Sequence, residues 1–370
     1  MALNGNLLEK TVKVGLNVWK GFKTMSSAPK TPRIMKAIGT HNGVFHCDEA
    51  LACFMLKQLP EYADAEIKRT RDQAILDACD IVVDVGAVYD HEKKRYDHHQ
   101  RSFNQTLSTV LPDVAKNKHI KLSSAGLVYA HYGKDVISTI MEKKDHALST
   151  DVIDVIFIAL YDGLIEELDA LDNGVPMYGG EPKYRINTHL GARVSKLNPS
   201  WNSTVKNDSD NLFYKAMELA GAEFTDKLVE LVTVWWPARF IVKNAIKTRL
   251  ITHESGAVIQ LSDPCPWKEH LLQLEEELGM SNQIKFVIYP DSNGSWRVQG
   301  IPVQPDSFIC RVFLHKDWMG LRDKQLSEVS NIPGCIFCHG NGFIGGNATK
   351  EGALLMATRS IKNETFADLI

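Results

Sequence analysis

The stretch that most constrains the fold is residues 80–101, where a short apolar run ends at an acid. Ile81-Val82-Val83 lead directly into Asp84 and then Val85-Gly86. A buried strand that ends in an acid and a glycine is how a parallel sheet presents a ligand at its carboxyl edge. Thirteen residues after Asp84 comes Asp97-His98-His99. Adjacent imidazoles beside a carboxylate suit borderline divalent metals, so we expect this stretch to form half of a metal site.

Short apolar and helical segments alternate around this stretch. Residues 37–40, 65–70 and 80–84 are predicted strands, and residues 50–59 and 73–78 are predicted helices, the first of them buried. Strand, helix, strand, helix, strand is the alternation of an α/β domain with a doubly wound, mostly parallel sheet.

The chain is long enough for two folded domains, and its pattern changes near residue 250. Residues 37–207 are predicted to form the first domain, which contains the stretch at 80–101. Residues 208–249 are predicted to form a helical connection of one or two long helices, with a break expected at Pro237. Residues 250–370 are predicted to form a second, smaller α/β domain. It contains a strand at 257–261, a helix at 267–278, a hairpin at 285–289 and 295–299, and a helix at 350–361.

Residues 1–36 are basic, amphipathic and poor in acids, with Glu9 as their single acid. Such a leader is typical of a mitochondrial presequence; the alternative is a disordered basic tail. A start at Met25 would give a shorter product and a second location, nuclear or cytosolic.

The net charge of −3 gives no whole-protein attraction to nucleic acid. No stretch approaches about 18 uninterrupted apolar residues, so we expect no membrane insertion.

The polar residues that carry the chemistry cluster after short predicted strands and in one acidic helix end. The set is His41, His46, Asp48, Glu49, Asp84, Asp97, His98, His99, Asp169 and Asp172. Residues 166, 169 and 172 are spaced by three and share a helical face, where like charges repel unless a cation bridges them. Two ions about 3.5–4 Å apart form a clamp for in-line attack on phosphorus. Mixed imidazole and carboxylate ligands favour Mn²⁺ over Mg²⁺. Taken alone, any one of these residues is better explained as a polar loop side chain with ordinary hydrogen bonds than as a metal ligand.

Four blocks of sequence resemble the DHH phosphoesterase superfamily, and more closely its MYG-type exonucleases (the melanocyte proliferating gene protein family). The blocks are residues 41–49, Asp84-Val85-Gly86, residues 95–101 and residues 167–174. The resemblance runs from about Ile38 to the C-terminus. It implies a catalytic DHH domain, a smaller DHH-associated domain, and 3′-to-5′ RNA exonuclease activity in mitochondria and nucleus. The implied partner is RNA with a single-stranded 3′ end, and a homodimer is left open.

The resemblance also implies roles for individual residues. Asp84 is expected to bridge two metals, and His98 to ligate one of them. Asp97 is expected to orient a histidine, and His99 to touch a substrate phosphate. His41, His46 and Asp48 are expected to supply the metal ligands from the block at residues 41–49. Asp169 or Asp172 is expected to complete the ligands of the second ion. The superfamily pattern His-x-x-x-Asp-x-Asp is not kept, since Phe45 and Cys47 stand at its acid positions. His46 and Asp48 therefore serve as substitutes shifted by one residue.

Basic side chains and glycines supply candidate substrate contacts. Gly345 and Gly346, together with Gly340 and Gly342, resemble the glycine-rich motif of the DHH-associated domain, with backbone N–H groups directed at a ligand. Arg193 and Arg185, with Lys183, would bind phosphates, although a solvated basic face explains them equally well. Trp201 would stack a base, although such a residue more often packs in a core.

Two further readings are kept open. The same site would also hydrolyse a small phosphate compound, such as pyrophosphate or an oligonucleotide product. Alternatively, the shifted first motif binds metal weakly, and the protein is a non-catalytic RNA-binding protein. The pattern Cys335-Ile336-Phe337-Cys338-His339 fits a c-type haem site, but we read it as strand because nothing else indicates a haem pocket.

Overall fold

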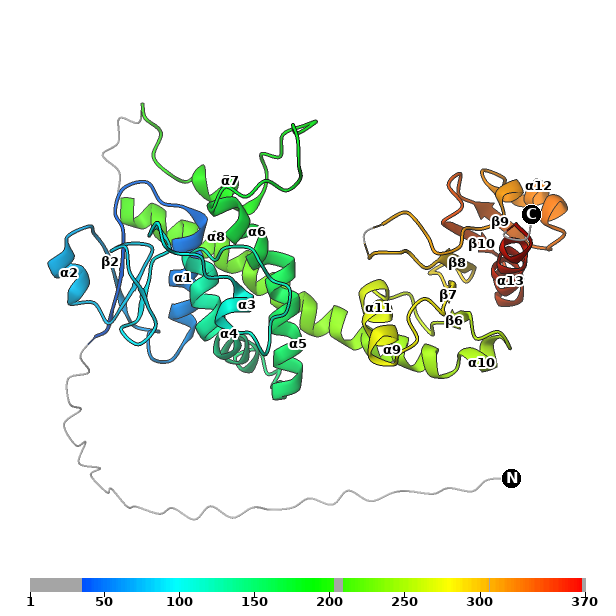
Figure 1. Cartoon of the computed structure of the whole chain (residues 1–370), viewed down its shortest axis with the longest axis horizontal. Coiled ribbons are helices and arrows are strands. Elements are labelled where there is room, and N and C mark those ends of the chain that lie inside the picture. The colour runs from blue at the N-terminus through cyan, green and yellow to red at the C-terminus, as the bar shows by residue number, and fades with distance from the viewer. Residues whose placement is uncertain (1–34, 203–208, 306, 368–370) are drawn as a thin grey trace, which may run out of the picture. The chain divides into compact units, whose positions relative to one another are not determined.

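The computed structural model describes residues 35–202, 209–305 and 307–367 (Figure 1). The leader expected over residues 1–36 lies outside these ranges, apart from Met35 and Lys36. The described chain contains two five-stranded sheets, each with its own helices. The α/β class is therefore confirmed.

The first sheet is mostly parallel, as expected. Its strands are β1 (Ala37–Thr40), β2 (Glu66–Arg69), β3 (Ile81–Val83), β4 (Tyr89–Asp90) and β5 (Arg95–Tyr96). The order is β2-β1-β3-β5-β4, and only the β4–β5 pair is antiparallel. Parallel neighbours place their carboxyl ends at one edge, and β1, β3 and β5 are consecutive in this order.

Alternating side chains divide the two faces of the first sheet. Ile38, Ile81 and Val83 face the large core, which contains α1 (Cys47–Gln58) and α4 (Ser124–Glu142). Ala37 and Val82 face the other side and pack with Leu76 of α2 (Gln73–Asp77). The period of two along these strands matches the pleat of a sheet buried on both faces. One face is thus covered far more heavily than the other.

The remaining helices of this part follow β5 in the chain. They are α3 (Leu107–Val110), α5 (Thr150–Leu160), the π-helical turn η1 (Tyr161–Ile165), α6 (Glu166–Asp172) and α7 (Leu190–Ser195). Helix α5, the turn η1 and helix α6 follow one another in direct succession. Their acidic end is α6, as the sequence indicated.

The break expected at Pro237 is wrong. Helix α8 (Ser209–Glu230), the π-helical turn η2 (Leu231–Trp235) and α9 (Trp236–Lys247) follow one another without a gap. In η2 the Trp236 N–H reaches back five residues to the Leu231 carbonyl. Pro237 then lies in the first turn of α9, where a missing N–H is tolerated. The wider π-helical turn accommodates the proline without ending the helix.

The second sheet has the order β6-β7-β8-β10-β9 and is mixed, with only β6–β7 parallel. Its strands are β6 (Val258–Gln260), β7 (Phe286–Pro290), β8 (Trp296–Gly300), β9 (Cys335–Cys338) and β10 (Ile344–Asn347). Its helices are α10 (Arg249–Thr252), α11 (Lys268–Glu277), η3 (Lys316–Trp318), α12 (Asp323–Ser330) and α13 (Lys350–Ala367). The β7–β8 hairpin is confirmed, since Tyr289 pairs with Arg297.

The expected domain boundaries stay a prediction. Val242 and Ile246 of α9 share a buried cluster with Ile259 and Leu271, so the end of the long helix packs with the second sheet. Within the described ranges, no helix is both long and apolar enough to span a bilayer.

Candidate metal centre

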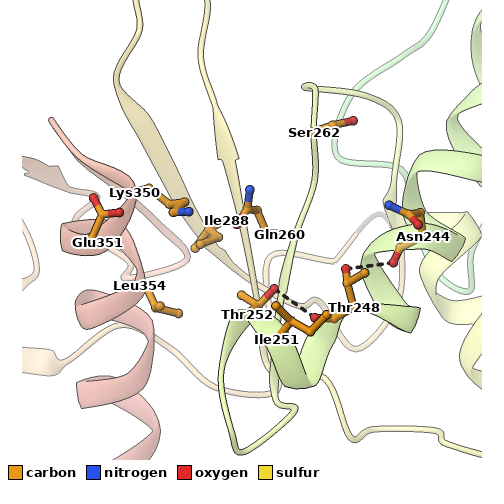
Figure 2. A pocket seen from close by; sticks show the side chains of 10 residues that line it. All are labelled: Asn244, Thr248, Ile251, Thr252, Gln260, Ser262, Ile288, Lys350, Glu351 and Leu354. Atoms are coloured by element: carbon orange, nitrogen blue, oxygen red, sulfur yellow. Dashed lines mark hydrogen bonds between the residues drawn. The ribbon is translucent and has the colours of Figure 1, made fainter.

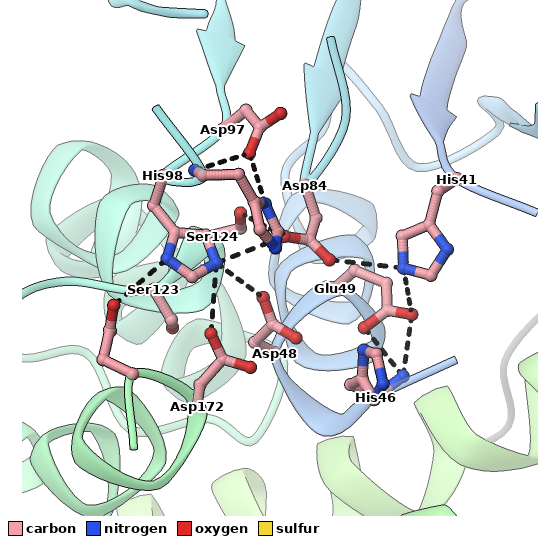
Figure 3. A network of polar contacts seen from close by, with 12 residues as sticks. His41, His46, Asp48, Glu49, Asp84, Asp97, His98, Ser123, Ser124 and Asp172 are labelled. Carbon is pink, nitrogen blue, oxygen red and sulfur yellow. Dashed lines mark hydrogen bonds and ion pairs between the residues drawn. The ribbon is translucent and has the colours of Figure 1, made fainter. Parts of the chain in front are cut away.

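The polar residues after the strands of the first sheet converge at one edge (Figure 3). His41 follows β1, Asp84 follows β3, and residues 97–99 follow β5. These three strands are neighbours in the parallel part of the sheet, so their carboxyl ends lie together. The first turn of α1 adds Asp48 and Glu49, and the end of α6 adds Asp172.

Asp84 lies between two histidines, one at each carboxylate oxygen. His41 Nε2 is 3.3 Å from Oδ2, and His98 Nε2 is 3.4 Å from Oδ1. All three side chains are buried. The backbone of Asp84 has φ = 58°, in the left-handed region that non-glycine residues rarely occupy. Such strain persists only where the surroundings impose it, and it concentrates at functional sites.

The other ring nitrogen of each histidine is held by an oxygen. His41 Nδ1 lies 3.1 Å from the Asn42 carbonyl, and His98 Nδ1 lies 3.4 Å from Asn173 Oδ1. The Asn173 amide is itself oriented, since its Nδ2 donates to the carbonyls of Lys121 and Asp169 at 2.9 and 2.8 Å. When Nδ1–H is donated to these oxygens, the Nε2 proton can be exchanged for a metal ion, which is the arrangement of metal-ligating histidines.

Carboxylates on either side of Asp84 complete two groups. Glu49 Oε1 is 3.1 Å from His41 Nε2, and the same carboxylate accepts from the His46 N–H at 2.8 Å. Asp172 Oδ2 is 3.1 Å from His98 Nε2. The ligating atoms of His41, His46, Glu49 and Asp84 lie within 4.8 Å of one another; so do those of Asp48, His98 and Asp172, and those of Asp84, His98 and His99. Asp84 therefore belongs to two of three overlapping groups.

The charges of this centre fit a bound cation. Both Asp48 oxygens and His98 Nε2 are buried and have no hydrogen-bond partner among the described residues. Burial and the nearby carboxylates of Asp84 and Asp172 raise the pKa of Asp48 well above its usual value. Buried groups of this kind are normally paired or bound to metal. The residues present therefore fit a metal that prefers mixed imidazole and carboxylate ligands.

Without a bound metal, the histidines partly compensate the negative charge of the carboxylates in this centre. Burial lowers the pKa of His41 and of His98, but the carboxylates close to each Nε2 outweigh it and raise each pKa to about 10. Burial correspondingly raises the pKa of Asp84, and the two histidines overcome that effect and lower it. Protons on the imidazoles thus stand where a cation would bind.

Asp97 organises the loop rather than joining a ligand group. Its Oδ1 accepts from the His99 backbone N–H at 3.0 Å and contacts His99 Nδ1 at 2.7 Å. Its Oδ2 accepts from the Ala87 N–H at 2.6 Å. Asp97 therefore orients His99, whose side chain is 62% exposed beside Asp84.

The two candidate acids of α6 have different surroundings. Asp169 is fully buried, and its Oδ1 accepts from the backbone N–H and hydroxyl of Ser123 at 2.9 and 2.7 Å. Burial raises the pKa of Asp169 to about 7. The geometry places Asp172 in a group with His98 and Asp48, whereas Asp169 anchors the start of α4.

The expected substrate contacts are spread more widely. Arg193 lies in α7 and pairs with Glu223 at 2.9 Å, while Arg185 is exposed between α6 and α7. Gly345 and Gly346 are paired residues of β10 in the second sheet rather than part of a loop before a helix. Trp201, 97% exposed, does not pack in a core.

Three contributors to the site received no role from the sequence. Glu49 contacts His41, Asn173 holds the Nδ1 side of His98, and the Ser124 hydroxyl donates to Asp84 Oδ1 at 3.1 Å. Glu49 carries a usable signal, because it stands three residues after His46 at the start of a helix and receives its backbone N–H.

A cavity of about 370 Å³ lies on the second sheet (Figure 2). Its walls come from α9, α10, β6, β7 and α13 and include Gln260, Lys350 and Glu351. The hydroxyls of Thr248 and Thr252 in its wall donate to carbonyls of their own helices. Its described lining contains no metal-binding group of the kind found at the first sheet.

Known proteins match nearly the whole folded chain. A family model, MYG1_exonuc, described as "Uncharacterised protein family (UPF0160)", matches residues 37–361. The MYG1 exonuclease of Mus musculus is 49% identical over 326 residues, which cover 88% of this chain and 84% of that protein. The MYG1 exonuclease of Homo sapiens is 47% identical over 331 residues, covering 89% and 86%. The MYG1 protein of Saccharomyces cerevisiae is 41% identical over 337 residues, covering 89% and 96%. No solved structure matches the chain significantly. The chain therefore belongs to the MYG1 exonuclease family.

Proposed function

We propose that this protein is a metal-dependent phosphodiesterase that shortens RNA from its 3′ end. The observation that carries the proposal is the buried Asp84 carboxylate, which offers one oxygen to the His41 side and the other to the His98 side. A shared carboxylate between two mixed-ligand groups is the core of a two-metal clamp on a phosphodiester. The printed names of the mouse and human relatives include the word exonuclease, which supports a nuclease.

The proposed ligands follow the two sides of Asp84. His41, His46 and Glu49 would hold one ion with Asp84, and His98, Asp172 and Asp48 would hold the other with it. When bound, divalent ions at such a site lower the pKa of water and neutralise charge on the phosphate. We favour Mn²⁺ over Mg²⁺ because imidazole ligands suit it better.

His99 is the proposed contact of the substrate phosphate. Asp97 raises the pKa of His99 through their hydrogen bond, so the imidazole keeps a positive charge to higher pH. Its exposed position lets it donate to a phosphate oxygen. Arg193 and Arg185, with Gly345 and Gly346, remain proposed substrate contacts.

The test uses the full chain with Mn²⁺, Mg²⁺ or EDTA, and 3′- or 5′-labelled RNA, DNA and pyrophosphate. Stepwise shortening of RNA from its 3′ end, lost in EDTA, is expected. Phosphate release from pyrophosphate with intact RNA would favour a small-molecule hydrolase, and binding without turnover under every metal would favour a non-catalytic RNA-binding protein.

A variant with Asp97, His98 and His99 replaced by alanine should lose hydrolysis. Asp113→Ala with His119→Ala is a matched control, because both side chains are exposed in the loop before α4. Retained activity in the triple variant would contradict the site.

We also propose that the protein acts in RNA processing in mitochondria and nucleus. The support is the basic leader over residues 1–36 and the internal Met25. Fluorescent fusions of the full chain and of a chain starting at Met25 should differ in mitochondrial signal. Equal mitochondrial signal would contradict the role of the leader.

A further inference from the structure

A second cavity, of about 340 Å³, is lined by residues on either side of Asp97 in the chain. Its walls come from residues 87–89 and from Gln100, Ser102, Phe103 and Gln105. Two of these wall residues are hydrogen-bonded to Asp97, the Ala87 N–H to its carboxylate at 2.6 Å and Gln100 Nε2 to its carbonyl at 2.9 Å. A ligand group in this cavity would therefore be beside the place proposed for the reacting phosphate.

The chemistry of the walls suits an uncharged, ring-containing group. None of the seven lining residues is acidic, basic or histidine, although Lys121 Nζ lies over the Phe103 ring, 5.4 Å from its centroid. Phe103 packs edge-on against Tyr89, with ring centroids 5.6 Å apart, and lies 6.3 Å from the His98 ring. The Tyr89 hydroxyl is fixed at 2.8 Å from His131 Nε2. Pockets of about 300–1,000 Å³ hold small ligands, and aromatic rings beside a phosphate site are the usual platform for a base.

One wall residue, Gln100, has a buried acceptor atom. Gln100 Nε2 is used by the Asp97 carbonyl, which fixes the orientation of the amide. Its Oε1 is buried and has no hydrogen-bond partner among the described residues. A buried acceptor without a partner carries a desolvation cost that a ligand donor would remove. Gln100 follows His99 directly and bonds the Asp97 carbonyl, so this acceptor lies on the loop that carries the proposed phosphate contact.

We propose that this cavity is the subsite for the 3′-terminal nucleoside, with Phe103 stacking its base and Gln100 Oε1 accepting a hydrogen bond from its ribose 2′-hydroxyl. The subsite rests on the proposed function, because the phosphate of the same nucleotide would lie at the metal centre. It supplies a physical basis for a preference for RNA, since the 2′-hydroxyl is what distinguishes RNA from DNA at one position.

Calorimetric binding of AMP and 2′-deoxy-AMP to the full chain, with Mn²⁺ and with EDTA, tests the subsite without turnover. The wild type should bind AMP about tenfold more tightly, the factor of one hydrogen bond to a buried acceptor. Gln100→Met should bring this ratio close to one. Phe103→Leu should weaken both ligands by roughly 5- to 100-fold and leave their ratio unchanged. Because both ligands carry the same phosphate, the ratio is insensitive to a disturbed metal centre.

Matched controls are Gln73→Met and Phe240→Leu, two exposed side chains on α2 and α9 that should leave both affinities unchanged. A wild type that does not distinguish the two nucleotides, or a ratio that survives Gln100→Met, would overturn the role of Gln100. Wild-type affinity in Phe103→Leu would overturn the stacking platform. If these variants bind like the wild type while Mn²⁺-dependent RNA shortening proceeds, the subsite fails and the proposed function stands. If the wild type binds AMP more tightly than 2′-deoxy-AMP but hydrolyses no RNA, the subsite stands and the proposed function fails.

Discussion

Replacing Asp48 with asparagine should stabilise the metal-free protein and remove most of its response to Mn²⁺. Both Asp48 oxygens are buried without a hydrogen-bond partner, and the Asp84 and Asp172 carboxylates are close enough to raise its pKa. Asparagine has nearly the same shape and no charge. The substitution therefore separates two effects of Asp48: its destabilisation of the metal-free protein and its contribution to Mn²⁺ binding.

The magnitude follows from proton linkage. Keeping this carboxyl protonated at pH 7, against an unfolded pKa of about 3.9, costs at most about 4 kcal/mol, since each pH unit is worth about 1.4 kcal/mol. The asparagine amide must still be buried, which costs about 1–3 kcal/mol on mutational scales. We therefore expect a net gain of about 1–3 kcal/mol. Because the folded pKa is raised, wild-type stability without metal falls as pH rises above about 4, and Asp48→Asn should reduce that slope.

Thermal unfolding in EDTA and in Mn²⁺, at pH 5 to 8, measures both effects. At a Mn²⁺ concentration 100 times its Kd, binding adds about 2.7 kcal/mol to the wild type. Asp48→Asn should have a Tm several degrees above the wild type in EDTA and a much smaller shift with Mn²⁺. Asp113→Asn, at an exposed acid, should match the wild type in both conditions. A lower Tm in EDTA, or an unchanged Mn²⁺ shift, would refute the reasoning.

Three further predictions concern stability. Gly126→Ala should cost about 1–3 kcal/mol in urea unfolding, because a Cβ there would overlap the buried Asp169 carboxylate; Gly179→Ala, with open space around it, is the control. Arg311→Met should cost about 3–5 kcal/mol in the same assay, because Glu275 would stay buried without its partner at 2.7 Å, and adding Glu275→Gln should recover part of the loss. Burial lowers the pKa of His270 to about 4, so its contribution is intact above pH 6.5 and is lost as pH falls toward 4. In His270→Gln the urea midpoint should depend less on pH over that range. A pH dependence as steep as that of the wild type would contradict this.

The meeting of Asp84 and His98 was predictable because parallel strands align their carboxyl ends. The hairpin was predictable because Asp291-Ser292-Asn293-Gly294 carries its own turn chemistry, and Asp291 accepts the N–H groups of Asn293 and Ser295. Both inferences use local patterns whose geometry is nearly fixed.

The choice between Asp169 and Asp172 could not be made from the sequence. Residues three apart on a helix share a face, so spacing cannot say which acid meets His98 and which meets Ser123. That depends on where α4 begins relative to α6, which is a matter of packing. The position of Gln100 beside a cavity likewise follows from tertiary structure alone.

The glycines of β10 show how a composition signal can have another cause. A Cβ at Gly345 would lie 2.9 Å from Leu314 Cδ1 and 3.0 Å from the Phe337 carbonyl oxygen. A Cβ at Gly346 would lie 2.8 Å from the Phe337 ring. Close packing across the second sheet therefore requires these glycines whether or not a ligand binds there.

The first motif illustrates why its departure from the superfamily pattern need not remove ligands. Phe45 is fully buried against Phe213, and its backbone N–H and carbonyl are both held by the Asn198 side chain. The position that carries an acid in the resembled pattern is therefore used here as a core anchor. The acids of this block, Asp48 and Glu49, stand in the first turn of α1, where Glu49 accepts the His46 N–H and contacts His41. A helix N-terminus stabilises negative charge there, so this turn can carry two buried acids that a loop would hold less well. In this chain the candidate acids of the first block therefore stand at the capped start of a helix.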